Sequence, residues 1–280
     1  MEPFTTKGKK AKDFSVIPCT FHLTPYTLVM SFPNLLHFLS ELKDDLLDFV
    51  YPQHCVICKK YLKREEKDVC ETCWNSLVTL PDPFCPYCKS FMEQEDAKCF
   101  FCDSTKKLWE DHIFLKVRSL GRFDDYYKEL IYQFKYGKKI PLGKRLGQGL
   151  GESISNDSNF LKSDFLIPVP LHKSRYWERG FNQSEIVADE ISKINGLPVL
   201  KNVLKRKKNT KDQTNLTREQ REENVRGAFV VAHPEIINGK NIILVDDVIT
   251  TGATLSECAR MLKQAGAEKI LGITIAVVTG

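Results

Sequence analysis

The chain has 280 residues, and at the usual size of ~150 residues per domain this length predicts about two domains. Its net charge of +5 permits an anionic partner without requiring one. Hydrophobic residues make up 42% and charged residues 28%, which is typical of a globular protein and not of a disordered one. No apolar run reaches the ~18 residues of a membrane-spanning helix, so no transmembrane segment is expected.

The N-terminal region lacks a regular pattern. Residues 1–33 carry lysine clusters without periodicity, which predicts a flexible extension, and Met30 is an alternative start of translation. Pro18, His22 and Pro25 interrupt the apolar stretch that follows the first lysines, unlike a secretory signal. Residues 34–52 repeat leucine at helical spacing, which predicts a short amphipathic helix.

Cysteine is the most informative residue type, with ten in the chain. Eight of them form four Cys-x-x-Cys pairs: Cys55/Cys58, Cys70/Cys73, Cys85/Cys88 and Cys99/Cys102. Two such pairs supply the four thiolates of a tetrahedral zinc site. A disulfide framework needs an oxidising compartment, and no clear export signal is present, so two structural Zn2+ sites in a reducing cytoplasm are expected.

The four pairs fall within residues 53–103, which we expect to form a double zinc ribbon whose folding free energy comes from the metal. The simplest pairing is sequential, with one zinc on Cys55, Cys58, Cys70 and Cys73 and the other on Cys85, Cys88, Cys99 and Cys102. The spacing leaves a cross-braced pairing open.

Residues 112–280 alternate strand and helix patterns. The strands are expected over 112–120, 164–169, 242–245 and 269–278. Helical patterns lie between them: an apolar stripe from Phe123 to Phe134, a helix that Asn182 caps with Glu185 as its partner, and a helix that buries Cys258. This order predicts an α/β fold with a mainly parallel sheet flanked by helices, preceded by the small zinc module.

One segment combines carboxylates with a small-residue loop. The apolar strand over 242–245 ends in Asp246 and Asp247, and residues 250–254 then open a helix. Free N–H groups at a helix start bind a phosphate, and the hydroxyls of Thr250, Thr251 and Thr254 add donors. An Asp pair accepts hydrogen bonds from a diol and holds Mg2+, so a ribose phosphate fits both halves. The alternative is a pair of aspartates that merely end a strand in solvent.

This segment resembles the phosphoribosyl diphosphate signature of type I phosphoribosyltransferases. The resemblance implies that Asp246 and Asp247 hold the ribose, close to the cationic charge that develops during catalysis. It implies that Thr250, Thr251, Gly252, Ala253 and Thr254 cradle the 5-phosphate.

Further motifs resemble the ComF family of competence proteins. They are Phe134-Lys135-Tyr136, Pro168-Val169-Pro170-Leu171-His172, Arg179-Gly180-Phe181-Asn182-Gln183, and Gln213 with Arg221, Asn224, Val225, Gly227, Ala228 and Phe229. The resemblance covers about Asn34–Gly280 and includes a cysteine-rich module before a phosphoribosyltransferase-like domain. It implies a cytoplasmic protein that handles imported single-stranded DNA, together with a DNA-uptake helicase or channel protein at the inner face of the membrane.

Two basic segments complete the predicted site. The loop after the 164–170 strand carries His172, Lys173 and Arg175, and with Arg179 these cations are expected to bind a diphosphate. His172 is expected to orient this loop. The cluster Lys205, Arg206, Lys207 and Lys208 is either a lid over phosphates or a contact for a nucleic-acid backbone, with Tyr136, Tyr176 and Trp177 as stacking platforms. The alternative in both cases is a solvated basic surface.

Two functions compete. The first is a competence factor that binds phosphoribosyl diphosphate with Mg2+ and contacts single-stranded DNA. The second is an active phosphoribosyltransferase of nucleotide salvage, although no glutaminase-like segment precedes the domain and no acceptor base can be named. A third possibility, a zinc scaffold with a purely structural α/β domain, is disfavoured by the intact Asp246-Asp247 and Thr250–Thr254 motif.

Overall fold

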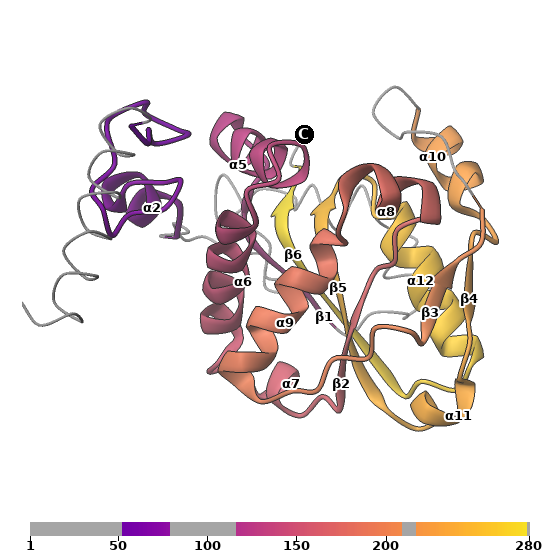
Figure 1. Ribbon diagram of the computed structural model, residues 1–280. Coiled ribbons are helices and arrows are strands. Elements are labelled where there is room, and N and C mark those ends of the chain that lie inside the picture. The colour runs from indigo at the N-terminus through magenta and orange to yellow at the C-terminus, as the bar shows by residue number, and fades with distance from the viewer. Residues whose placement is uncertain (1–51, 79–115, 209–216, 279–280) are drawn as a thin grey trace, which may run out of the picture. The chain divides into compact units, whose positions relative to one another are not determined.

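The structure is a computed structural model that describes residues 52–78, 116–208 and 217–278 (Figure 1). The chain divides into two compact units, Met1–Tyr51 and Pro52–Gly280, and the described residues all belong to the second. The predicted extension over 1–33, the alternative start at Met30, the predicted helix up to Tyr51, and the second cysteine set all lie outside the described residues.

A four-stranded parallel sheet lies at the centre of the described fold, with the strand order β1-β6-β5-β2. Its strands are β1 (Lys116–Arg122), β2 (Phe165–Pro168), β5 (Asn241–Ile249) and β6 (Lys269–Val277). Two short strands, β3 (Leu204–Arg206) and β4 (Phe229–Val231), pair antiparallel as a separate ribbon. The predicted α/β fold with a parallel sheet is therefore confirmed.

Helices cover both faces of the sheet (Figure 1). They are α5 (Asp125–Lys135), α6 (Ile140–Ile154), α7 (Ser158–Leu161), α8 (Lys173–Arg179), α9 (Gln183–Asn195), α10 (Arg218–Val225), α11 (Pro234–Ile237) and α12 (Ala253–Gln264), with α2 (Glu71–Val78) in the cysteine-rich segment. Along β5, Ile242 and Leu244 pack into the core on the α12 side, and Ile243 and Val245 pack into the core on the α6 and α9 side. Burial on both faces explains the unbroken apolar run of this strand.

The central strand is longer than its apolar run. The sequence predicts an apolar strand over 242–245 that ends in Asp246 and Asp247, and β5 continues to Ile249 because Asp246 pairs with Thr274 and Val248 with Ala276 in the register with β6. Both aspartates are thus fixed inside a regular strand and not in the loop that follows it.

Helix α9 begins as predicted. The Asn182 side chain accepts a hydrogen bond from the Ser184 backbone N–H at 3.1 Å, and its amide nitrogen donates to Glu185 Oε1 at 3.2 Å. Helix α12 also agrees with its predicted pattern, and Cys258 is fully buried in the core.

Several helices were not predicted, and two of them, α6 and α8, contribute to the site. Helix α6 contains glycines that disfavour a helix, yet a Cβ at Gly147 would come within 3.1 Å of the Val187 backbone oxygen, so glycine allows α6 and α9 to pack closely. The segment predicted as a basic loop after β2 forms the short helix α8, because His172 Nδ1 accepts from the Ser174 N–H and Gly180 adopts a left-handed conformation that ends the helix. Among the described residues, no helix combines the length and the apolar character that crossing a membrane requires.

Candidate functional site

The acidic pair lies near the carboxyl end of β5, a central strand of the parallel sheet. This is the edge at which ligands of open α/β sheets bind. The side chains are largely removed from solvent, since Asp246 is 8% exposed and Asp247 is 6% exposed. Two adjacent buried carboxylates repel each other unless cations or donors compensate them.

Asp247 has both kinds of partner. Lys135 Nζ, in the last turn of α5, lies 2.7 Å from Asp247 Oδ2 in an ion pair. The Gln183 side-chain amide, in the first turn of α9, donates to the same oxygen at 2.6 Å. The carboxylate thus joins two helices to the central strand.

Asp246 is less well compensated. Its Oδ1 accepts from the Asp247 backbone N–H at 2.9 Å and from Ser184 Oγ at 3.3 Å. Burial and the neighbouring charge of Asp247 raise the pKa of Asp246 to about 7, although these hydrogen bonds and the Lys135 charge act in the opposite direction.

A second layer of contacts holds the partners of the pair. Arg179 donates to Gln183 Oε1 at 2.5 Å, and its guanidinium lies 5.4 Å from the centre of the Tyr136 ring. The Asn182 amide nitrogen donates to the Val169 backbone oxygen at 3.1 Å, which ties the start of α9 to the end of β2. The motifs at residues 134–136, 168–172 and 179–183, which are separate in the sequence, therefore meet around Asp247.

The loop after β5 lies next to Asp246, as predicted. Gly252 has φ of 76° and opens α12, and the Ala253 N–H contacts Thr251 Oγ1 at 3.4 Å. Asp246, Gly252 and residues 253–255 line one cavity of about 20 Å³, together with Val248, Ile249 and Thr250. Such a volume holds about one water molecule, so a ribose phosphate requires the loop or its neighbours to move.

The predicted cations of the diphosphate site are only partly assembled. Arg179 reaches the acidic pair through Gln183. Arg175 forms an ion pair with Glu178 within α8 at 3.5 Å, and Lys173 is exposed at the start of that helix.

The four basic residues over 205–208 do not share one face. Lys205 and Lys207 are exposed, whereas Arg206 is half-buried with its guanidinium 5.3 Å from the centre of the Phe229 ring. Burial lowers the pKa of Arg206, and the Asp246 charge is close enough to counteract this shift. Lys208 Nζ donates to the Arg226 backbone oxygen at 2.8 Å. A nucleic-acid contact made by all four together does not agree with this arrangement.

A second candidate site is a metal centre. The sulfur atoms of Cys55, Cys58, Cys70 and Cys73 all lie within 4.8 Å of one another, and the Cys58 and Cys70 sulfurs are 3.7 Å apart. Tetrahedral zinc with Zn–S bonds of ~2.3 Å requires sulfurs about 3.8 Å apart, so the cluster fits Zn2+. Burial disfavours the Cys55 thiolate, but hydrogen bonds from nearby backbone N–H groups outweigh this and lower its pKa to about 7. The sequential pairing predicted for this set agrees with the geometry.

The cysteine cluster is anchored to the α/β fold. Arg145 of α6 donates to the Val69 backbone oxygen at 2.8 Å and stacks 4.2 Å from the Trp74 ring centre. Lys139 Nζ lies 2.7 Å from Asp68 Oδ1, and the Tyr127 hydroxyl donates to the Leu77 backbone oxygen at 3.0 Å. These contacts join the ribbon to α5 and α6.

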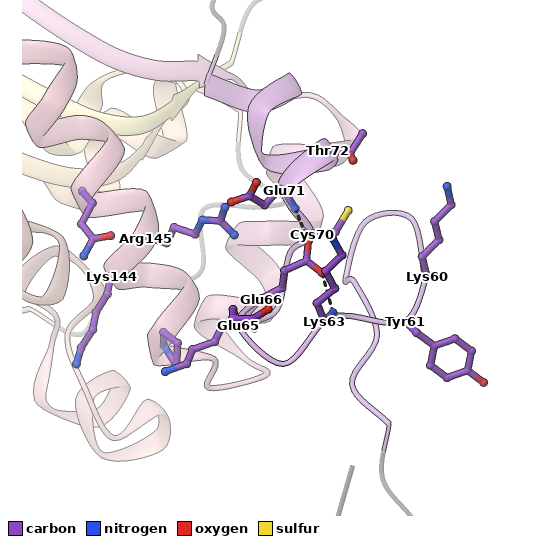
Figure 2. A pocket seen from close by; sticks show the side chains of 13 residues that line it. Lys60, Tyr61, Lys63, Glu65, Glu66, Cys70, Glu71, Thr72, Lys144 and Arg145 are labelled. Carbon is purple, nitrogen blue, oxygen red and sulfur yellow. Dashed lines mark hydrogen bonds between the residues drawn. The ribbon is translucent and has the colours of Figure 1, made fainter. Parts of the chain in front are cut away.

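A groove of about 850 Å³ separates the ribbon from part of α6 (Figure 2). Its charged lining mixes both signs: Lys60, Lys63, Lys67, Lys144 and Arg145 with Glu65, Glu66 and Glu71. Glu66 accepts hydrogen bonds from the backbone N–H groups of Glu71 and Lys63, which lower the pKa of its carboxyl. Glu66 therefore has a structural role in shaping the ribbon.

Comparison with known proteins agrees with both candidate sites. Residues 46–106 match the double zinc ribbon domain, and residues 178–279 match the phosphoribosyl transferase domain. Competence protein F of Haemophilus influenzae is 29% identical over 220 residues, which cover 77% of this chain and 93% of that protein. Competence protein ComFC of Bacillus subtilis is 27% identical over 226 residues, covering 79% of this chain and 88% of that protein. Over more than three quarters of its length, the chain is similar to the ComF competence proteins.

The chain is also similar to proteins with other names. The DNA utilization protein YhgH of Escherichia coli is 26% identical over 222 residues, covering 78% of this chain and 94% of that protein. Among solved structures, the glutamine phosphoribosylpyrophosphate amidotransferase of B. subtilis is 22% identical with a TM-score of 0.33, covering 47% of this chain and 26% of that one. A purine phosphoribosyltransferase from Pyrococcus horikoshii is 21% identical with a TM-score of 0.31, covering 48% of this chain and 72% of that one. The part of the chain that matches the amidotransferase corresponds to about a quarter of the length of that enzyme.

Three residues of the site were not predicted as site residues. Lys135, Gln183 and Ser184 contact the acidic pair directly. Lys135 and Gln183 belong to the ComF-like motifs, so the resemblance contained a signal for them that the phosphoribosyltransferase signature did not.

Proposed function

We propose that this protein binds phosphoribosyl diphosphate with Mg2+ at the acidic pair and the Thr250–Thr254 loop. The observation that carries the proposal is the shared cavity, which both Asp246 and the loop line. Asp246 and Asp247 would hold the ribose hydroxyls and the Mg2+ of the ligand, because carboxylate oxygens are suitable ligands for this ion. The loop N–H groups and threonine hydroxyls would hold the 5-phosphate, and Arg179, Arg175 and Lys173 the diphosphate.

We also propose a role in handling single-stranded DNA during DNA uptake. The relatives named for competence and DNA utilization support this role. In this proposal the partner is a DNA-uptake helicase or a channel protein. That partner would hold the chain in the cytoplasm, at the inner face of the membrane. Lys205, Lys207 and Lys208 are the exposed members of the basic cluster, and Lys208 also donates to the Arg226 backbone oxygen.

Zinc has a structural role in this proposal. Cys55, Cys58, Cys70 and Cys73 would hold one Zn2+, and Cys85, Cys88, Cys99 and Cys102 a second one within a double ribbon over 53–103. Four cysteine ligands leave no open coordination position for substrate, so the ribbon would contribute folding free energy and not chemistry.

The second candidate function is an active phosphoribosyltransferase of nucleotide salvage. The match to the phosphoribosyl transferase domain favours it. Here Asp246 and Asp247 would stabilise the positive charge that develops at the anomeric carbon. Diphosphate release from phosphoribosyl diphosphate and Mg2+, measured with a panel of bases, separates the two functions. Turnover that depends on one base supports the salvage enzyme, whereas binding without turnover supports the competence factor.

A further inference from the structure

Helix α8 stands out because the described structure buries none of its seven side chains. Short helices in water are held by packing an apolar face, and α8 has no such face. It is held instead by its ends, with His172 at the start and left-handed Gly180 at the end. Arg179 contacts Gln183 and Tyr136, whereas Tyr176 and Trp177 are exposed and accessible to a partner.

The exposed side chains of α8 are aromatic. Trp177 is 82% exposed and Tyr176 is 45% exposed. Two more exposed tyrosines lie near the end of α8: Tyr136, which is 51% exposed, contacts Arg179 of α8, and the ring centre of Tyr132 lies 5.2 Å from that of Tyr136. A single exposed aromatic is ordinary, but two on one short helix, with two more linked to that helix through Arg179, indicate an interaction surface.

The charge of α8 identifies the kind of partner. Its seven residues include Lys173, Arg175 and Arg179 but one acidic residue, Glu178. Cations interleaved with exposed aromatic rings are the combination that binds single-stranded nucleic acid, where the cations follow the phosphates and the bases stack on the rings.

The position of α8 also fits. Figure 1 shows α8 and α5 at the same end of the sheet, and Arg179 connects the two through Tyr136. The same arginine donates to Gln183, which holds Asp247. The aromatic group therefore lies at the rim of the candidate ligand site.

We infer that α8, with Tyr136 and Tyr132, is the surface on which this protein stacks the bases of single-stranded DNA. The inference rests on the DNA-handling role proposed above. It places the main DNA contact on α8 and not on the basic cluster at 205–208. A protein partner would also favour exposed Trp and Tyr, but the excess of cations on α8 favours a polyanion.

The test is the binding of a fluorescein-labelled oligothymidylate to the full chain, followed by anisotropy over a range of salt concentrations. Trp177→Ala should weaken binding by about tenfold or more, because stacking of one base contributes on the order of a tenfold change in affinity. The slope of log K against log salt should stay unchanged, since no phosphate contact is lost. Trp177→Phe keeps an aromatic ring and should stay close to wild type.

Tyr126→Ala is the matched control, because Tyr126 is 56% exposed but lies in the first turn of α5, at the end opposite Tyr136. Unlabelled duplex should compete poorly, since its bases are already stacked. If the wild-type chain binds the oligonucleotide but Trp177→Ala binds equally well, the α8 surface is wrong and the DNA-handling role stands. If the wild-type chain does not bind it even at low salt, the DNA-handling role is wrong as well.

Discussion

Lys135 Nζ lies 2.7 Å from Asp247 Oδ2, so the carboxylate expected to hold a ribose hydroxyl is already neutralised by a cation of the protein itself. Gln183 donates to the same oxygen. Both partners occupy Asp247 Oδ2, so a ligand that bound this oxygen in the proposed site would displace them. Lys135 would then be able to contact the negatively charged ligand.

The ion pair should stabilise the fold at neutral pH. Lys135→Met keeps the length of the side chain but leaves the buried Asp246–Asp247 pair without its cation. Breaking one side of a buried pair costs about 3–5 kcal/mol, and partial exposure of Lys135 (19%) lowers our expectation to about 1–3 kcal/mol. Urea unfolding at pH 8 measures the loss. Lys144→Met, at an exposed position of α6, is the control, and equal losses in the two variants would contradict a specific role of Lys135.

Stability should depend on pH through Asp246. Its pKa is about 7 in the folded chain and close to 4 when unfolded, so between these values the folded state binds more protons. The contribution of this group to stability therefore falls as pH rises from about 4 to about 7, by up to ~1.4 kcal/mol per pH unit. Asp246→Asn removes the titrating carboxyl and with it this pH-dependent contribution to stability. The difference between wild-type and variant unfolding free energies should change over this pH window, and a constant difference would refute the shifted pKa.

Asn182 should matter more than an ordinary helix cap. Its side chain accepts from Ser184 N–H and donates to the Val169 oxygen, so Asn182→Ala removes the cap of α9 and its link to β2. The expected loss is about 1–3 kcal/mol in chemical unfolding. Asn159→Ala in the short α7, where the side chain is exposed, should change stability little. A loss below roughly 0.5 kcal/mol for Asn182→Ala, the size of a neutral surface substitution, would show that the link to β2 contributes nothing.

Metal analysis should return about two Zn2+ per chain purified under reducing conditions. Cys73→Ser removes one ligand of the first cluster, so its zinc content should fall to about one while Cys258→Ser, at a core cysteine outside the cluster, keeps two. Chelation should remove ribbon structure and retain most of the far-ultraviolet signal of the α/β fold. A chain that contains no zinc would overturn the proposed double ribbon.

The sequence predicted the elements whose pattern is local. The apolar run of β5, the cap at Asn182, and the adjacency of Asp246 to the threonine loop follow from short-range rules and are confirmed. Helix α6 was missed because its glycines oppose helix formation, and the close packing of Gly147 and Gly151 against α9 compensates for them.

Two features of the structure depend on contacts that no local sequence pattern shows. The cluster at 205–208 looks like one basic patch in the sequence, but it begins in strand β3, where successive side chains point to opposite faces, and Arg206 turns inward over Phe229. The ion pair of Lys135 with Asp247 joins α5 to β5 across long sequence separation, so no local pattern reveals it.

The most direct test of the proposed ligand site is isothermal titration of the full chain with phosphoribosyl diphosphate and Mg2+. Asp246→Asn with Asp247→Asn keeps the shape of the site and removes both charges. The wild-type chain should bind, and the double variant should bind on the order of tenfold more weakly or worse, a change of about 1.4 kcal/mol or more. Equal affinity in the two proteins, with the fold of the variant intact by circular dichroism, would contradict the assignment of this acidic pair as the ribose site.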